Sequence, residues 1–123
     1  KTVRVIYSNP PAHGGLTVAT VLSDENLYNK WVEELDEMRN RIVAMRSALV
    51  DGLAKRNTEF DFSFIKEQGG MFSFSGLDDD TVAWLRREKG IYVVGGGRIN
   101  VAGLTSSNVD YVCDSIAEAL AAK

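Results

Sequence analysis

The segment GGGRINVAGL, at residues 95–104, predicts a short strand that begins directly after three glycines. Because side chains alternate along a strand, Ile99 and Val101 face one side, and Arg98 and Asn100 face the other. We expect the apolar side to lie in the core and Arg98 to lie on the opposite side of the sheet. The preceding glycines allow another backbone or a ligand to approach closely. An arginine in this position is suited to binding a carboxylate or phosphate through two parallel hydrogen bonds.

Other roles for Arg98 remain open on the residues alone. On the pattern alone, a solvated strand residue or the partner of an acidic side chain elsewhere in the chain is the favoured interpretation of Arg98. The glycines do not form a phosphate-binding loop of the known kind, because they precede a predicted strand, whereas such loops precede a helix.

A long helix is predicted upstream, from about Glu25 to Lys55. No glycine or proline occurs between residues 16 and 51, and apolar residues recur every three or four positions. These residues are Leu27, Trp31, Leu35, Met38, Ile42, Met45, Leu49 and Leu53. At about 1.5 Å per residue the helix would be on the order of 45 Å long, which exceeds one small domain. Such a helix forms a coiled coil or joins two bodies of a larger protein, and the irregular charges beside the apolar positions favour the second.

The remaining segments predict an α+β fold, in which the long spine helix is followed by a small mixed sheet with helices packed on it. Two consecutive prolines form a rigid connector near the start of the chain, and residues 12–15 continue this break. Short helices are predicted at residues 16–22, 78–89 and about 109–120, and strands at residues 60–65, 70–75, 91–94 and 98–102. Predicted helix ends are marked by Ser23 and Asp24, by Asp78–Asp80 and Gly90, and by residues 105–107.

Composition narrows the possible functions. The 123 residues are 45% hydrophobic and 25% charged, which is typical of one globular domain. Fourteen basic residues among 17 acidic ones give a net charge of −3, so nucleic acid is not expected as a partner. Cys113 is the only cysteine and His13 the only histidine, so we expect a buried, inert thiol and no metal site. No apolar run reaches bilayer length and no leader is recognised, so we expect no membrane association.

Four segments resemble, in order, the C-terminal part of aspartate and aromatic aminotransferases, the class I pyridoxal-phosphate enzymes of fold type I. They are YSNPPAHG at residues 7–14, EMRNRIVAMR at 37–46, GGMFSFSGL at 69–77 and GRINVAGL at 97–104. The likeness extends over essentially the whole chain. It implies that residues 1–23 are an interface loop and short helix from the end of the large domain, residues 24–56 the connecting helix, and residues 57–123 the small α+β domain.

The resemblance also implies roles for individual residues. Arg98 would bind the α-carboxylate of an amino-acid or keto-acid substrate. Arg4 would bind the distal carboxylate of aspartate or glutamate in the site of the neighbouring subunit of a homodimer. Phe72 would form an aromatic wall beside the substrate, although its alternative role is that of a core phenylalanine. Ser8 and Asn9 would lie in the interface loop near this site.

The implied activity is transamination of aspartate or glutamate with 2-oxo acids, using pyridoxal 5'-phosphate, in the cytoplasm or an organelle matrix. The family's Schiff-base lysine and most of its cofactor-binding motifs precede the matched region and do not occur here. We therefore expect no catalytic or cofactor-binding residue in this chain, and no bound cofactor or activity for the chain alone. The alternatives are a segment of an aromatic aminotransferase, or an independent α+β module whose long helix mediates self-association or binds a partner.

Overall fold

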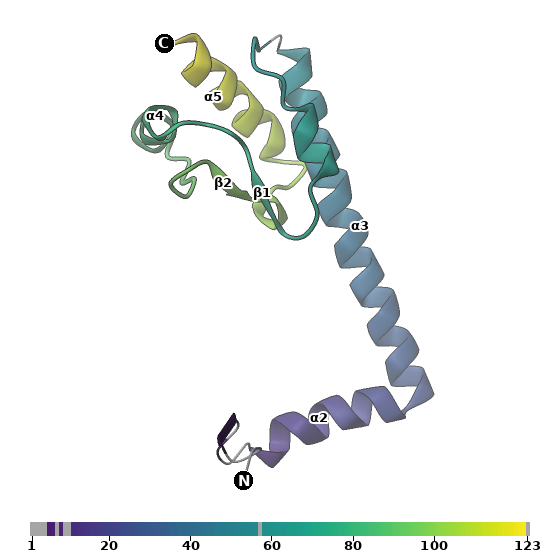
Figure 1. Ribbon diagram of the computed structural model, residues 1–123. Coiled ribbons are helices and arrows are strands. Elements are labelled where there is room, and N and C mark those ends of the chain that lie inside the picture. The colour runs from purple at the N-terminus through teal and green to yellow at the C-terminus, as the bar shows by residue number, and fades with distance from the viewer. Residues whose placement is uncertain (1–4, 7, 9–10, 57, 123) are drawn as a thin grey trace. The chain divides into compact units, whose positions relative to one another are not determined.

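The computed structural model describes residues 5–6, 8, 11–56 and 58–122. Its main elements run in the order α2 (Ala12–Ser23), α3 (Glu25–Lys55), η1 (Ser63–Glu67), β1 (Phe72–Phe74), α4 (Asp79–Lys89), β2 (Arg98–Asn100), η2 (Val101–Gly103) and α5 (Val109–Ala121), where η is a 3-10 helix (Figure 1). This order confirms the predicted α+β class. The chain divides into two compact units, Lys1–Met38 and Arg39–Lys123. The three-part division taken from the resemblance stays a prediction.

The first unit contains α2 and the beginning of α3. The break predicted at residues 12–15 was wrong, because α2 already begins at Ala12 and includes Gly14 and Gly15. Pro11, at φ −66°, precedes this helix with a backbone angle that favours helix initiation. The predicted cap of α3 is confirmed, since Asp24 Oδ1 accepts hydrogen bonds from the backbone N–H groups of Asn26 and Leu27, both at 3.0 Å.

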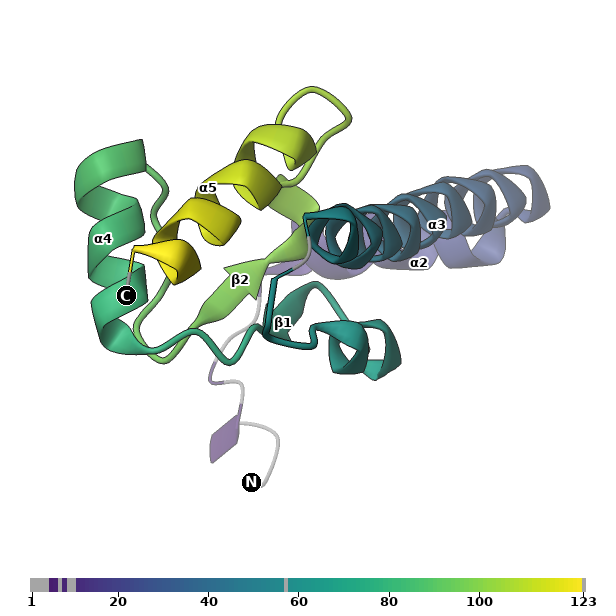
Figure 2. The same ribbon diagram turned by 90° about the horizontal axis from the view of Figure 1, so that it is seen from above.

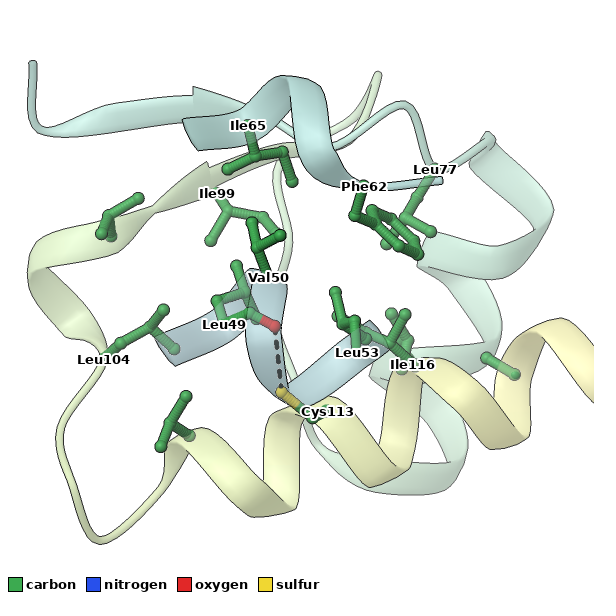
Figure 3. Close-up of a cluster of buried hydrophobic side chains, with 14 of the residues drawn as sticks. Leu49, Val50, Leu53, Phe62, Ile65, Leu77, Ile99, Leu104, Cys113 and Ile116 are labelled. Atoms are coloured by element: carbon green, nitrogen blue, oxygen red, sulfur yellow. Dashed lines mark hydrogen bonds between the residues drawn. The ribbon is translucent and has the colours of Figure 1, made fainter. Parts of the chain in front are cut away.

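The hydrophobic core of the second unit lies around the last turns of α3. Figure 3 shows Leu49 and Leu53 of α3 between Ile65 of η1 and Ile116 of α5, and all four side chains are fully or almost fully buried. The apolar stripe predicted for the long helix is therefore a core surface at its C-terminal end. In the first unit its residues Leu27, Trp31, Leu35 and Met38 are exposed.

The sheet consists of β1 and β2, which pair antiparallel with Ser73 opposite Ile99 (Figure 2). Both strands were predicted at the right positions, but each is shorter than expected, and η2 replaces the end of the second. The predicted alternation is confirmed: Ile99 and Val101 are buried, and Arg98 and Asn100 are exposed.

The strand predicted at residues 60–65 was wrong, because this segment bends and enters η1. Asp61 explains the difference: its carboxylate accepts hydrogen bonds from both the backbone N–H and the hydroxyl of Ser63, at 2.8 Å each. Such local bonds compete with strand pairing, and they also lower the pKa of the Asp61 carboxyl. Phe60 and Phe64 are consequently exposed, while Phe62 is buried.

The strand predicted at residues 91–94 is reduced to a single bridge between Val94 and Arg98. Gly90, at φ 64°, ends α4 as predicted, and the backbone N–H of Ile91 then donates to Leu85 O at 3.1 Å. Because its N–H is used in this bond, Ile91 cannot donate it to a neighbouring strand. The predicted start of α4 is confirmed as well, because Asp78 Oδ1 accepts from Thr81 N at 2.9 Å.

The start of α5 differs from the prediction. Asn108 is its N-cap residue, and no side chain caps the helix. Instead of capping, Asn108 Oδ1 accepts from Thr105 N at 2.8 Å and Asn108 Nδ2 donates to Gly103 O at 3.1 Å, so that Asn108 shapes the preceding loop.

Cys113 of α5 contacts the backbone of α3. Its thiol is fully buried and donates to Leu49 O over 3.5 Å (Figure 3). Burial raises the pKa of the thiol to about 11, so the group is protonated at neutral pH, in agreement with the predicted inert thiol. A Cβ atom added at Gly52 of α3 would lie only 2.7 Å from Cys113 Sγ, so a larger residue at this position would force the thiol or the helices to shift.

We predict that Gly52→Ala lowers the free energy of unfolding by about 1–3 kcal/mol, because the new methyl group overpacks the contact with Cys113. In a Cys113→Ala background the same substitution should be neutral, or stabilising by up to about 1 kcal/mol, through better helix propensity. Urea unfolding of the four variants measures both effects. Equal effects of Gly52→Ala in the two backgrounds would show that the sulfur is not the obstacle.

Candidate functional site

The exposed face of the two-stranded sheet carries the candidate site. The pairing register places Phe72 opposite Asn100 and Phe74 opposite Arg98, and all four side chains are on the exposed face. Ser73 and Ile99 lie on the other face, which is buried. Phe72 is 47% exposed, so it is not a core phenylalanine.

Arg98 and Phe72 lie in contact across the strands. The guanidinium carbon of Arg98 is 5.3 Å from the centroid of the Phe72 ring, within the range of a cation–π interaction. In the part of the chain that the structure describes, Arg98 forms no ion pair with an acidic side chain. The alternative in which an acid of this chain neutralises Arg98 is thus not observed. Its guanidinium N–H groups remain available to an anionic ligand.

The turn before β2 fixes the backbone position of Arg98, the first residue of the strand. Gly96 and Gly97 have φ angles of 73° and 76°, which side-chain-bearing residues rarely adopt. A Cβ atom on Gly97 would lie 2.7 Å from Leu77 O and 2.8 Å from Ser75 Oγ. Ser75 also donates to Gly97 O from its hydroxyl, at 2.6 Å, and from its backbone N–H, at 2.8 Å. The predicted close backbone approach is confirmed at Gly97, whereas a Cβ atom at Gly95 or Gly96 would have open space around it.

Hydrogen bonds from Gln68 complete the other edge of β1. Gln68 Nε2 donates to Phe74 O at 3.0 Å, and Phe74 N donates to Gln68 Oε1 at 2.8 Å. The side-chain amide thus takes the place of a neighbouring strand. Sequence reasoning missed this role, because a single glutamine gives no local signal of it.

Two arginines of α3 hold the sheet and η2 on the helix. Arg46 Nε donates to Ser73 Oγ at 3.2 Å, and its Nη2 donates to Gly70 O. Arg41 donates to Ala102 O at 3.2 Å and to Leu104 O at 2.8 Å. Sequence reasoning missed both residues. A signal was present for Arg46, which precedes the buried Leu49 and Val50 by three and four positions and therefore lies on the core side of the helix.

The other residues proposed from the resemblance belong to the first unit. Arg4 and Asn9 lie outside the described residues. Ser8 is described: it is exposed, and its φ of 56° is uncommon for a residue with a side chain.

The described residues of the sheet face provide a guanidinium and aromatic rings but no amine. Lys30 pairs with Glu34, Lys66 with Asp51 and Lys89 with Glu118. A guanidinium beside aromatic rings fits a carboxylate ligand. In the same residues no group of three or more His, Cys, Asp and Glu side chains could hold a metal ion, and no helix has the length and apolarity to cross a membrane.

The second unit is a small α+β domain whose two-stranded sheet presents an arginine beside a phenylalanine ring on its exposed face. The chain belongs to the aminotransferase class I and II family, whose model matches residues 1–116. It is 54% identical to the aspartate aminotransferase of Haemophilus influenzae over 118 residues, which are 96% of this chain and 30% of that protein.

Solved structures agree with this membership. The aromatic-amino-acid aminotransferase of Burkholderia pseudomallei, covalently bound to pyridoxal phosphate, superposes with a TM-score of 0.91 at 53% identity, over 96% of this chain and 30% of that one. The aromatic aminotransferase of Psychrobacter sp. B6, cocrystallised with aspartic acid, gives 0.90 at 44% identity, over 97% and 30%. The chain thus spans about 30% of the length of these relatives.

We predict that Gly97→Ala destabilises the chain by about 1–3 kcal/mol, because the methyl group meets Leu77 O and the backbone angle is unfavourable for alanine. Gly95→Ala is the matched control: a Cβ atom there has no other atom within 4 Å, and Gly95 has no positive φ. Its effect should stay within about 0.5 kcal/mol. Chemical denaturation measures both, and equal losses would contradict the role assigned to Gly97.

Proposed function

We propose that this chain is the substrate-carboxylate-binding part of a pyridoxal-phosphate-dependent aminotransferase that acts on aspartate or glutamate and on 2-oxo acids. The observation that carries the proposal is the Arg98 guanidinium, which lies on the exposed face beside Phe72 without an acidic partner among the described residues. Family membership supplies the reaction class, and three relatives at 49–54% identity are aspartate aminotransferases.

In this proposal Arg98 binds the α-carboxylate of the substrate. A planar guanidinium offers two parallel N–H donors, which replace the water that a carboxylate loses on binding and also fix its orientation. Phe72 covers one side of the guanidinium and excludes water there. Holding one end of a small substrate in this way places its reactive carbon in a defined position, which is itself a large contribution to catalysis.

The second carboxylate of the substrate is assigned to Arg4, acting from the neighbouring subunit of a homodimer, with Ser8 and Asn9 near the same site. Two guanidinium groups at opposite ends of a four- or five-carbon acid would set its register. The cofactor would be held by residues outside this chain, because the described residues provide no lysine on the sheet face.

An aromatic aminotransferase is the second candidate. It is favoured by the likeness to the Burkholderia enzyme at 53% identity. The Psychrobacter enzyme is an aromatic aminotransferase that was cocrystallised with aspartic acid. Substrate preference therefore has to be measured.

We predict that Arg98 and Arg4 differ in their substrate dependence. The test enzyme is the Haemophilus aspartate aminotransferase with its matching 118-residue segment replaced by this chain. Arg98→Ala should lower kcat/KM about 100- to 1,000-fold for both aspartate and phenylalanine, because every amino acid has an α-carboxylate. Arg4→Ala should lower it for aspartate far more than for phenylalanine. Steady-state kinetics measures kcat/KM of each variant relative to the unsubstituted hybrid enzyme, with aspartate and with phenylalanine.

The unsubstituted hybrid enzyme is the control and must transaminate aspartate. An unchanged kcat/KM in Arg98→Ala would refute the assignment of the α-carboxylate. Equal losses for both substrates in Arg4→Ala would refute the distal-carboxylate role and favour the aromatic candidate.

We also predict that the 123-residue chain alone neither transaminates aspartate nor becomes labelled with pyridoxal phosphate at one lysine after borohydride reduction. The physical reason is that no described lysine lies on the face that carries Arg98. Peptide mapping by mass spectrometry measures the labelling, with the hybrid enzyme as the positive control. Stoichiometric labelling of a single lysine in the isolated chain would contradict the prediction.

A further inference from the structure

The most unusual polar group in the second unit is the guanidinium of Arg46. Arg46 is only 4% exposed, and within the described residues no ion pair joins it to a carboxylate. Burying a charge costs free energy, and an apolar side chain at such a site is often as stabilising as a charged one. Stability alone therefore gives no reason for an arginine at this position. Its hydrogen bonds indicate another role.

Both acceptors of Arg46 belong to the segment that contains Phe72. Gly70 O accepts from Nη2, and Ser73 Oγ accepts from Nε at 3.2 Å. These two residues lie on either side of Phe72 in the sequence. Because the guanidinium is planar and donates to both residues, it restricts sliding of this segment along α3 and its rotation relative to the helix. Phe72 therefore has little freedom to move along the helix.

The position of β1 determines the surroundings of Arg98. Phe74 lies directly opposite Arg98 in the sheet, and the Phe72 ring contacts the Arg98 guanidinium. Ser73, between the two phenylalanines, faces the buried side of the sheet. Arg46 thus acts from the face opposite to Arg98 and does not itself touch a ligand bound there.

We propose that Arg46 is a positioning residue for carboxylate binding: by holding β1 on α3, it keeps Phe72 against Arg98 and aligns the Arg98 guanidinium for the substrate. This inference rests on the proposed function and adds to it a residue behind the site. Loss of the Arg46 bonds would leave β1 supported by β2 and Gln68, so the fold would persist while the alignment of Arg98 became looser.

Arg56 provides the matched control. It follows α3 directly and makes three hydrogen bonds, one more than Arg46: Nε donates to Asp114 Oδ1 at 2.6 Å, Nη1 to Gly52 O at 2.8 Å and Nη2 to Asp110 O at 3.2 Å. All of these partners belong to α3 or α5, and none belongs to the sheet. Removing Arg56 should therefore lower stability without changing carboxylate binding.

The experiment uses the hybrid enzyme with Arg46→Lys, Arg46→Met, Ser73→Ala and Arg56→Met, at a temperature where each variant is folded by circular dichroism. Arg46→Met should raise the Kd of succinate, an unreactive dicarboxylate, and the KM of aspartate about tenfold or more, because even small misplacement of a binding group is costly. Arg46→Lys keeps the charge and one hydrogen bond, and should recover part of this loss. Arg56→Met should lower the Tm but leave both constants within about twofold.

Ser73→Ala removes the hydrogen bond between Arg46 Nε and Ser73 Oγ but keeps the charge of Arg46. It should raise the same constants by a smaller factor, and it should add nothing in an Arg46→Met background, because the two residues act through one bond. Succinate binding that is unchanged in Arg46→Met, or that weakens equally in Arg56→Met, would overturn the positioning role. Arg98→Ala in the same enzyme distinguishes failure of the Arg46 role from failure of the proposed function. If neither Arg46→Met nor Arg98→Ala changes succinate binding, the proposed function fails. If Arg98→Ala abolishes binding while Arg46→Met leaves it unchanged, only the role of Arg46 is refuted.

Discussion

The sheet that carries Arg98 has two strands of three residues each, and a sheet of this size is not stable in water without support. The geometry of the site therefore depends on what holds the two strands. Arg46 holds β1 on α3, Gln68 occupies the free edge of β1, and Gly97 brings the turn before β2 against Leu77. Each support comes from a different part of the chain. The position of the Arg98 side chain is thus a property of the whole second unit.

This arrangement leaves the hydrogen-bond donors of the Arg98 guanidinium unoccupied by an acidic side chain of the described residues. Its guanidinium stands over a phenylalanine ring, which provides a weak interaction and no hydrogen-bond acceptor. An internal carboxylate would satisfy the donors more fully, but a substrate carboxylate would then have to displace it and leave it unpaired. Because the ring holds the side chain without occupying its donors, Arg98 is positioned in advance and still available. Such preorganisation reduces the entropy lost when a ligand binds.

The features that could be predicted from the sequence are those that local chemistry determines. Asp78 and Gly90 fix the ends of α4, and alternation placed Arg98 on the exposed side of its strand. The strand predicted at residues 60–65 failed because hydrogen bonds between Asp61 and Ser63 outweighed an alternating aromatic pattern. Spacing along α3 places Arg46 on the core side of the helix, but it does not identify Gly70 and Ser73 as its partners, because these residues are 24 and 27 positions away. Contacts of that kind depend on packing that no local pattern records.

The long helix has two kinds of surface, and this bears on whether the chain is a module or a piece of an enzyme. Leu49 and Leu53 are buried in the core, whereas Trp31 and Leu35 in the first unit are 43% and 45% exposed. Exposed apolar residues at helical spacing are expected to meet another surface. An independent module would need a separate partner to cover them. The chain spans 30% of its aspartate aminotransferase relative, so the proposed enzyme would provide both that cover and the cofactor-binding residues from its other parts. The proposal that the chain is part of a larger aminotransferase thus accounts for both the exposed apolar residues and the incomplete chemistry of the site.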